Sequence, residues 1–220
     1  MVFPHPLCAN SDGILAAGGE LSPERLELAY SFGIFPWYSE GDPLLWWFPN
    51  PRMVLFPKQI VVSKSMRPYF NQKKYICTFD LEFGRVIRQC SEVPRAGQYG
   101  TWITDDMIEA YCELYHRGLA HSVEVWQEGE LVGGLYGVAI GKIFFGESMF
   151  SLQPNSSKFA LITLARVLLE RGFVLIDCQQ ETPHMARMGA RPMAAEKFYQ
   201  YIRKNLFFTD INRVLWKDIK

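Results

Sequence analysis

Three polar side chains interrupt apolar stretches of this sequence. Asp177 and Gln179 lie two residues apart in FVLIDCQ (173–179), and Glu147 lies inside IFFGESMF (143–150). If 173–179 is a strand, the side chains of Asp177 and Gln179 emerge on the same face. A buried carboxylate such as that of Glu147 needs a cation. Two interpretations stay open: structural roles, namely a hydrogen-bonded acid at 177 and an internal ion pair at 147, or a polar site that orients a substrate.

Positive charge is concentrated between residues 58 and 88. Seven basic residues in this range meet only two acidic ones. The seven are Lys58, Lys64, Arg67, Lys73, Lys74, Arg85 and Arg88. The whole chain of 220 residues is neutral, with 23 basic and 23 acidic side chains, so its composition argues against a nucleic-acid binder. A local patch is what a neutral chain would need to hold phosphates, and a solvated surface is the alternative.

Several common catalytic motifs are absent from the sequence. GGLYGVAIGK (133–142) is one residue short of a phosphate-binding P-loop, and neither GxSxG nor HExxH occurs. No Gln or Arg is followed three residues later by the glycine of the acetyl-CoA pyrophosphate loop. The five cysteines are widely spaced without CxxC, which favours neither a disulfide framework nor a zinc site. We expect no metal and no cofactor.

Capping residues and apolar periodicity predict the elements that would hold these side chains. Helices are predicted between Ser22 and Gly33, from Thr104 to Gly118, from about Ser156 to Glu170, and more weakly over 194–204. Strands are predicted over 121–127, 130–141, 142–151 and 173–179. Gly133 and Gly134, inside a strand, indicate a bulge or a close backbone approach by a ligand.

This order of elements predicts an α/β fold (mixed α+β) around a mostly buried sheet. Residues 33–57 hold five prolines and three tryptophans and are expected to be irregular. We therefore place a domain boundary near 55–60, and the order of strands and helices over 121–180 suits an N-acyltransferase fold. The N-terminus lacks the pattern of a signal peptide and no apolar run approaches the ~20 residues of a membrane span. A cytoplasmic protein without a membrane partner is expected.

Several stretches of the sequence are more specific than the apolar patterns that any buried core requires. They include GIFPWY (33–38), HSVEVW (121–126) and GESMFS (146–151), within longer runs that extend from Phe3 to about Phe198. The sequence resembles the leucyl/phenylalanyl-tRNA–protein transferases, bacterial enzymes of the N-degron pathway. The resemblance implies transfer of Leu or Phe, sometimes Met, from aminoacyl-tRNA to acceptor proteins with an N-terminal Arg or Lys. It also implies two domains, which we place as a small N-terminal domain over 1–57 and an acetyltransferase-like catalytic domain with a mixed sheet over 58–220. It implies no cofactor, and we expect a monomer.

The resemblance also implies roles for particular residues. Gln179 would orient the attacking α-amine, and Asp177 would help to remove or stabilise its proton. That Glu147 binds the cation of the acceptor's first residue is our own hypothesis, because a buried carboxylate needs a cation. Positioning alone is a sufficient strategy because the ester of charged tRNA is already activated, and glutamine is no base. The donor side-chain pocket would be lined by Leu135, Phe144, Met149, Leu164 and Leu168. Trp46, Trp102 and Tyr111 would contact the terminal adenosine, and the seven basic residues would hold the tRNA backbone.

Small departures from the family pattern occur. Arg187 stands where the family has serine, and WWFPNPR (46–52) stands where WWSPDPR is common. Two alternatives to the transferase stay open: an acetyl-CoA N-acyltransferase, which the missing pyrophosphate loop disfavours, and a non-catalytic tRNA or N-degron binding module. The binding module would need neither Asp177 nor Gln179.

Overall fold

A seven-stranded mixed sheet forms the centre of the protein. The computed structural model describes residues 2–39, 41–93, 102–205 and 216–219. Across the sheet the strand order is β10-β4-β9-β8-β7-β6-β5. The strands are β4 (Arg52–Leu55), β5 (Ile76–Phe79), β6 (Ala120–Gln127), β7 (Glu130–Ile140), β8 (Ile143–Ser151), β9 (Leu175–Gln179) and β10 (Arg191–Met193). β8 and β9 run parallel and the other neighbours run antiparallel.

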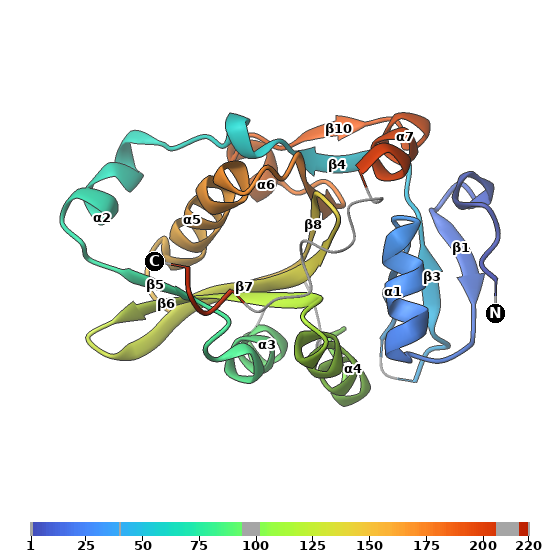
Figure 1. Ribbon diagram of the computed structural model, residues 1–220, viewed down its shortest axis with the longest axis horizontal. Helices are drawn as coiled ribbons and strands as arrows, with labels where there is room; N and C mark the ends of the chain where they lie inside the picture. The colour runs from blue at the N-terminus through green and yellow to red at the C-terminus, as the bar shows by residue number, and fades with distance from the viewer. Residues whose placement is uncertain (1, 40, 94–101, 206–215, 220) are drawn as a thin grey trace.

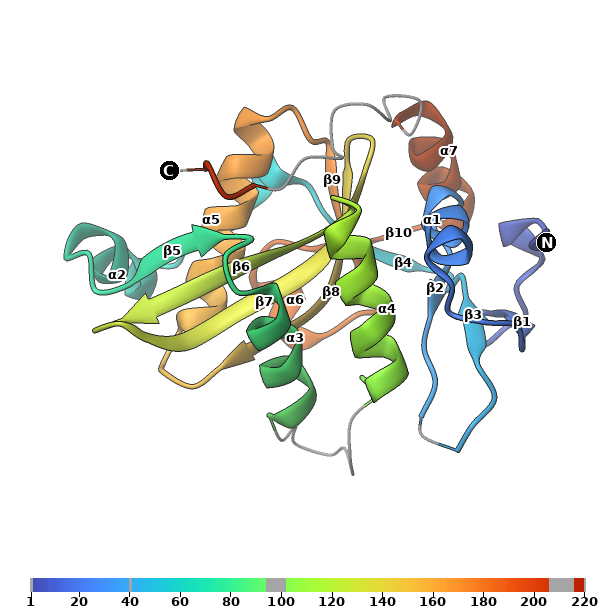
Figure 2. The same ribbon diagram turned by 60° about the horizontal axis from the view of Figure 1, so that its bottom comes forward.

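Helices cover both faces of this sheet (Figure 1). On one face lie α1 (Pro23–Ser31), α3 (Phe83–Glu92), α4 (Asp105–His116) and α7 (Ala195–Asn205). On the other lie α2 (Arg67–Asn71), α5 (Ser156–Glu170) and α6 (Pro183–Arg187), with the short 3-10 turns η2 (Pro57–Gln59) and η3 (Lys64–Met66) nearby. Figure 2 shows α3 and α4 crossing the sheet on the side away from α5. Each face therefore has its own apolar core.

A second, three-stranded sheet lies at the N-terminal end of the molecule. It has the order β1-β3-β2 and consists of β1 (Ile14–Ala17), β2 (Phe35–Pro36) and β3 (Leu45–Trp47), preceded by the 3-10 turn η1 (Pro6–Cys8). β4 lies within the range 33–57 that we expected to be irregular, yet it pairs with β9 and β10 in the large sheet. The last strand of the small sheet is therefore β3, and the first strand of the large sheet is β4.

The predicted fold class and the strongest predicted elements are confirmed. Ser22 and Thr104 accept hydrogen bonds from the backbone of the first turns of α1 and α4, as their positions predicted. α5, α7, and the strands β6 to β9 also occupy the predicted ranges to within a few residues. In the described part of the chain, no helix combines the length and the apolar character that crossing a membrane requires.

Gly133 is required by packing within the protein. A Cβ atom at this position would lie 2.3 Å from Oγ of Ser156, the first residue of α5. The same hydroxyl donates to the carbonyl of Val132, so the helix start is held tightly against β7. At Gly133 the predicted close approach is therefore made by α5 and not by a ligand, and the pairing of β6 and β7 shifts its register beside it, between Val125 and Trp126.

Candidate active site

A small pocket opens where the parallel strands β8 and β9 separate. Their pairing ends at Phe145 and Asp177, although β8 continues to Ser151. The cavity beside this point has a volume of about 240 Å³, smaller than the roughly 300–1,000 Å³ of sites for drug-sized ligands. Its walls come from β7, β8, β9, α5 and α6. A space of this size suits one apolar side chain.

Four of the five residues predicted for the donor pocket line this cavity. They are Leu135, Phe144, Met149 and Leu164. Leu168 is not among the lining residues and lies fully buried in the core behind them. Leu161, Ile176 and Met185 complete the apolar walls and were not predicted. Leu161 precedes Leu164 by one helical turn, so the apolar stripe of α5 could have indicated it.

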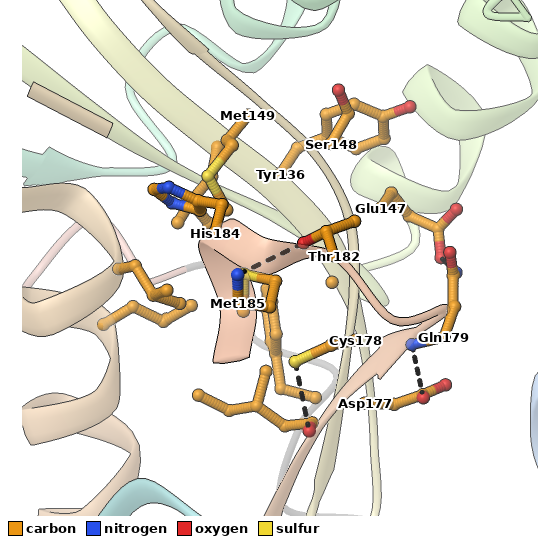
Figure 3. A pocket seen from close by; sticks show the side chains of 16 residues that line it. Tyr136, Glu147, Ser148, Met149, Asp177, Cys178, Gln179, Thr182, His184 and Met185 are labelled. Carbon is orange, nitrogen blue, oxygen red and sulfur yellow. Dashed lines mark hydrogen bonds between the residues drawn. The ribbon is translucent and has the colours of Figure 1, made fainter. Parts of the chain in front are cut away.

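The rim of the pocket is polar, and three of its side chains were predicted. Glu147, Asp177 and Gln179 all line the cavity (Figure 3). The amide nitrogen Nε2 of Gln179 donates to Oε1 of Glu147 at 2.9 Å. With its N–H side committed to this carboxylate, the amide of Gln179 leaves its carbonyl oxygen for another partner.

Glu147 is buried beside the pocket, with 8% of its surface exposed. Its Oε2 accepts a hydrogen bond from the hydroxyl of Tyr111, which in turn forms a short contact with the hydroxyl of Tyr30. Within the described residues, no basic side chain forms an ion pair with Glu147. Burial raises the pKa of Glu147 to about 7, although the hydrogen bonds from the two tyrosines lower it. The internal ion pair that we considered from the sequence is therefore not formed.

Asp177 is held by an arginine that the sequence did not single out. Its two carboxylate oxygens accept from Nε and Nη2 of Arg52 at 2.8 and 2.6 Å, and both side chains are fully buried. Oδ1 of Asp177 also accepts from the backbone N–H of Gln179 at 2.9 Å. Neither oxygen is free to take a proton without disrupting this ion pair. In the sequence, an arginine directly before the apolar residues Met53, Val54 and Leu55 marks a charge that needs a partner, but nothing local identifies that partner.

Gln179 has a strained backbone. Its φ is +60°, in the left-handed region that non-glycine residues seldom occupy. The hydrogen bond from its N–H to Asp177 holds this conformation, and the ion pair with Arg52 fixes Asp177 in turn. Strain of this kind persists only where the surroundings impose it, and it is concentrated at functional sites. The structure therefore places Gln179 precisely, through a chain of contacts from β4 to β9.

The three predicted adenosine contacts differ in their access to solvent. Trp46 and Tyr111 are fully buried, and the indole N–H of Trp46 donates to the carbonyl of Gly18. Trp102 is half-buried, as is Trp37. The hydroxyl of Tyr38 lies 3.3 Å from that of Thr104, so the segment with Trp37 contacts the segment with Trp102.

The seven predicted tRNA contacts form two groups. All are exposed, but Lys58, Lys64, Arg67, Lys73 and Lys74 lie on or beside η2, η3 and α2. Arg85 and Arg88 lie on α3, on the opposite face of the sheet (Figure 1). The continuous run of positive charge in the sequence is therefore not one continuous surface. The pocket is bordered by α5 and α6, and so it shares a face with the larger group.

No group of three or more His, Cys, Asp or Glu residues in the described part of the chain is arranged to hold a metal ion. All five cysteines are free. The rim residue His184 is half-buried, and burial together with Lys158 and Arg187 lowers its pKa. The site therefore offers a neutral imidazole, a glutamine amide and a buried carboxyl group.

The apolar pocket is bordered by Gln179, whose backbone is strained, and by Glu147, whose pKa is raised. Enzyme active sites commonly combine such a pocket with groups of perturbed pKa. Residues 54–203 match the family model described as "Leucyl/phenylalanyl-tRNA protein transferase", and residues 19–50 match the model of its N-terminal domain. The chain belongs to the leucyl/phenylalanyl-tRNA–protein transferase family and is an aminoacyltransferase.

Similar proteins of this family come from several bacteria. The protein named "Leucyl/phenylalanyl-tRNA--protein transferase" from Pseudomonas fluorescens (strain Pf0-1) is 54% identical over 195 residues, covering 89% of this chain and 86% of that protein. Its namesake from Myxococcus xanthus (strain DK1622) is 54% identical over 197 residues, covering 90% and 84%. Among solved structures, a GCN5-related N-acetyltransferase from Kribbella flavida shares 12% identity at a TM-score of 0.40, covering 66% of this chain and 55% of that one.

Proposed function

We propose that this protein transfers Leu or Phe, and also Met, from charged tRNA to the N-terminal Arg or Lys of acceptor proteins, acting as a cytoplasmic monomer and marking the acceptors for degradation. The observation that carries the proposal is the pairing of a small apolar pocket with the amide of Gln179 at its rim. The names of the relatives supply the donor class.

The donor's side chain would fill the apolar cavity. Leu135, Phe144, Met149 and Leu164 line it, and its volume of about 240 Å³ suits a side chain of the size of Leu or Phe. A β-branched side chain would widen at the entrance, beside the rim. Such steric misfits are worth roughly 1–3 kcal/mol per methyl-sized group, enough to separate Leu from Ile or Val.

Gln179 would position the attacking amine. In the reaction, the acceptor's α-amine attacks the ester carbonyl, the bond to the ribose oxygen breaks, and a proton moves from the nitrogen to that oxygen. The ester is already activated, so orientation supplies most of the catalysis. The carbonyl of Gln179 faces away from Glu147 and would accept a hydrogen bond from the amine.

Asp177 would act on the reaction through Gln179. Both its oxygens are occupied by Arg52, and it holds the backbone of Gln179 in the left-handed conformation. We assign it to stabilising this geometry, and with it the charge that develops on the amine, in preference to direct proton transfer. Arg52 belongs to the same positioning unit.

Glu147 would bind the side-chain cation of the acceptor's first residue. It is a buried carboxyl group that lacks a cation within the described residues, and its pKa is raised to about 7 mainly by burial. An incoming guanidinium or ammonium group favours the charged form of a carboxylate, so acceptor binding and ionisation of Glu147 would reinforce each other.

The terminal adenosine would contact exposed aromatic faces near the pocket. Of the three residues predicted for it, Trp102 keeps an accessible indole, and Trp37 lies on the segment that contacts it through Tyr38 and Thr104. Stacking of a base on an aromatic ring is worth about 1–3 kcal/mol. Trp46 and Tyr111 would support these rings and Glu147 from the interior.

The test is transfer of radiolabelled Leu and Phe from charged tRNA to a protein with an N-terminal Lys and to the same protein with an N-terminal Ala. We expect label on the first and not on the second. Glu147→Gln is expected to raise KM for the Lys-ended acceptor while leaving KM for the charged tRNA unchanged. Equal labelling of both acceptors, or no labelling of either, would overturn the proposal.

A further inference from the structure

Trp216 lies in the core behind the pocket, close to the end of the chain. It is 3% exposed, and its indole stacks on the imidazole of His121 with centroids 3.9 Å apart and planes within 7°. The rings of Phe79, Phe144 and Phe173 surround it at centroid distances of 6.5, 6.1 and 6.0 Å. An indole enclosed in this way is a packed part of the α5-face core.

A buried carboxylate anchors the backbone of this residue. Oδ2 of Asp80 accepts from the backbone N–H of Trp216 at 2.5 Å and lies 2.8 Å from Nδ1 of His121. The other oxygen, Oδ1, accepts from the backbone N–H of Ser122. Asp80 is fully buried and holds a left-handed φ of 57° at the end of β5. The segment that carries Trp216 is therefore tied to β5 and β6 by a charge-assisted hydrogen bond, which is stronger than a neutral one.

Phe144 connects Trp216 to the pocket. Phe144 is 1% exposed and lines the cavity, whereas Trp216 does not line it. A Cβ atom at Gly137 would lie 2.6 Å from the Phe144 ring, so the ring already lies against the backbone of β7 on that side. Trp216 packs against the same ring with centroids 6.1 Å apart and does not line the cavity, so it would limit movement of the Phe144 ring away from the cavity.

We propose that Trp216 determines the depth of the donor pocket by holding Phe144 in place, and so helps to set the preference among donor side chains. This inference rests on the proposed function, since it assigns the cavity to the donor. Trp216 lies outside residues 19–50 and 54–203 that the family models match.

Removing the indole should enlarge the pocket. A large-to-small change in a core leaves a void that the neighbouring side chains fill only in part. In Trp216→Ala, the Phe144 ring would move into this void and the cavity would deepen. The deeper cavity would favour Phe, the larger of the two donor side chains, over Leu. Apolar pockets discriminate by about 10-fold or more per methylene of misfit, so we expect the ratio of kcat/KM for Phe-tRNA to that for Leu-tRNA to rise at least about threefold.

Two further variants separate this role from general loss of stability. Asp80→Asn keeps the shape and tolerates the left-handed backbone but weakens the anchor, so the same ratio should rise while the indole is still present. Ile87→Ala removes a fully buried side chain from α3 on the opposite face and should leave the ratio unchanged. The ratio compares two donors in one preparation, so it does not depend on the amount of folded protein.

The outcomes are distinct. A ratio that rises in Trp216→Ala and Asp80→Asn but not in Ile87→Ala supports the inference. A ratio that is unchanged in the first two, or that changes equally in all three, overturns it. If Trp216→Ala does not fold, Trp216→Leu replaces it under the same criteria. Failure of the unmodified protein to transfer either amino acid refutes the proposed function itself.

Discussion

Glu147 controls the electrostatics of the site. Its carboxyl group is buried against two tyrosines and the amide of Gln179, and burial raises its pKa to about 7. In the unfolded chain this pKa returns to near 4.5. Between these values the folded state binds the proton more tightly, so Glu147 favours folding below about pH 4.5, and this contribution is lost as the pH rises through 7.

We therefore expect Glu147→Gln to remove a pH-dependent part of the stability. Relative to this variant, the unmodified protein should lose up to about 3 kcal/mol of unfolding free energy between pH 4.5 and 7, because each pKa unit corresponds to 1.36 kcal/mol. Urea denaturation of both proteins at pH 5 and pH 8 measures the difference. Glu113→Gln, at an exposed carboxylate of α4, is the control. A difference in stability between the unmodified protein and Glu147→Gln that does not change with pH would contradict the assignment.

The part of the site that could be predicted from the sequence consists of polar residues within apolar segments. Glu147, Asp177 and Gln179 stand out because each interrupts an apolar strand, and all three lie at the pocket. Arg52 was not found because its partner Asp177 is 125 residues away, and no local pattern reports such a contact. Trp46 was predicted to reach the substrate but is fully buried in β3, the middle strand of the small sheet.

At the scale of elements, β4 and β9 are joined by a buried ion pair. Arg52 also donates to the carbonyl of Gly33, and its guanidinium carbon lies 4.6–5.6 Å from the ring centroids of Phe35, Phe48 and Phe198. One charged group thus connects the end of α1, the large sheet and α7. Loss of one partner would leave an uncompensated charge in the interior.

Arg52→Met and Asp177→Leu should each destabilise the protein by about 3–5 kcal/mol, whereas the double variant should be less destabilised than either single one. A double-mutant cycle from urea denaturation measures this coupling. Activity should not recover in the double variant, because Gln179 loses the acceptor that holds its left-handed backbone. Recovery of transfer together with stability would show that Gln179 needs no such support.

Close packing between Gly133 of β7 and Ser156 of α5 also stabilises the arrangement of elements. We expect Gly133→Ala to cost about 1–3 kcal/mol of unfolding free energy, because the new methyl group would overlap the side chain of Ser156. Ser156→Gly removes that side chain. In the Ser156→Gly background, Gly133→Ala should therefore cost less unfolding free energy than it does in the unmodified protein. Gly84→Ala, where a methyl group meets open space, is the control. Equal effects of the alanines at 133 and 84 would contradict the packing argument.

Elements with strong punctuation were predictable, and weakly marked ones were not. Side-chain hydrogen bonds cap the first turns of α1 and α4, whereas Glu82, the residue before α3, makes no such bond. The apolar stripe of α3 is nevertheless buried; it consists of Phe83, Val86, Ile87 and Cys90. β2, β3 and β4 have two to four residues each and are separated by prolines, so their pattern is too short to read. Their pairing depends on partners far along the chain, β9 among them.

For the whole molecule, the distribution of charge determines how a neutral protein could hold tRNA. Lys64 and Arg67 are exposed beside α2, on the face of the sheet that borders the pocket. Arg85 and Arg88 are equally exposed on α3, on the other face. The donor pocket is bordered by α5 and α6, whereas Trp37 and Trp102, which are proposed to contact the adenosine, pack against the core on the α3 face. A stem that approaches the pocket along the α5 face would bring its phosphates to Lys64 and Arg67 and not to Arg85 and Arg88.

We expect Lys64→Ala/Arg67→Ala to weaken binding of charged tRNA and Arg85→Ala/Arg88→Ala to leave it nearly unchanged, although each variant removes two positive charges. Each lost phosphate contact should flatten the slope of log K against log[salt] by about 0.7–0.9, so the first variant, which removes two, should lose up to about 1.4–1.8 from that slope. Titration of each protein with charged tRNA from 50 to 200 mM salt, a range over which such contacts respond strongly, provides the measurement. Because the net charge of the two variants is the same, equal losses would mean that only the overall charge matters, and an unchanged slope in both would exclude these residues from the tRNA contact.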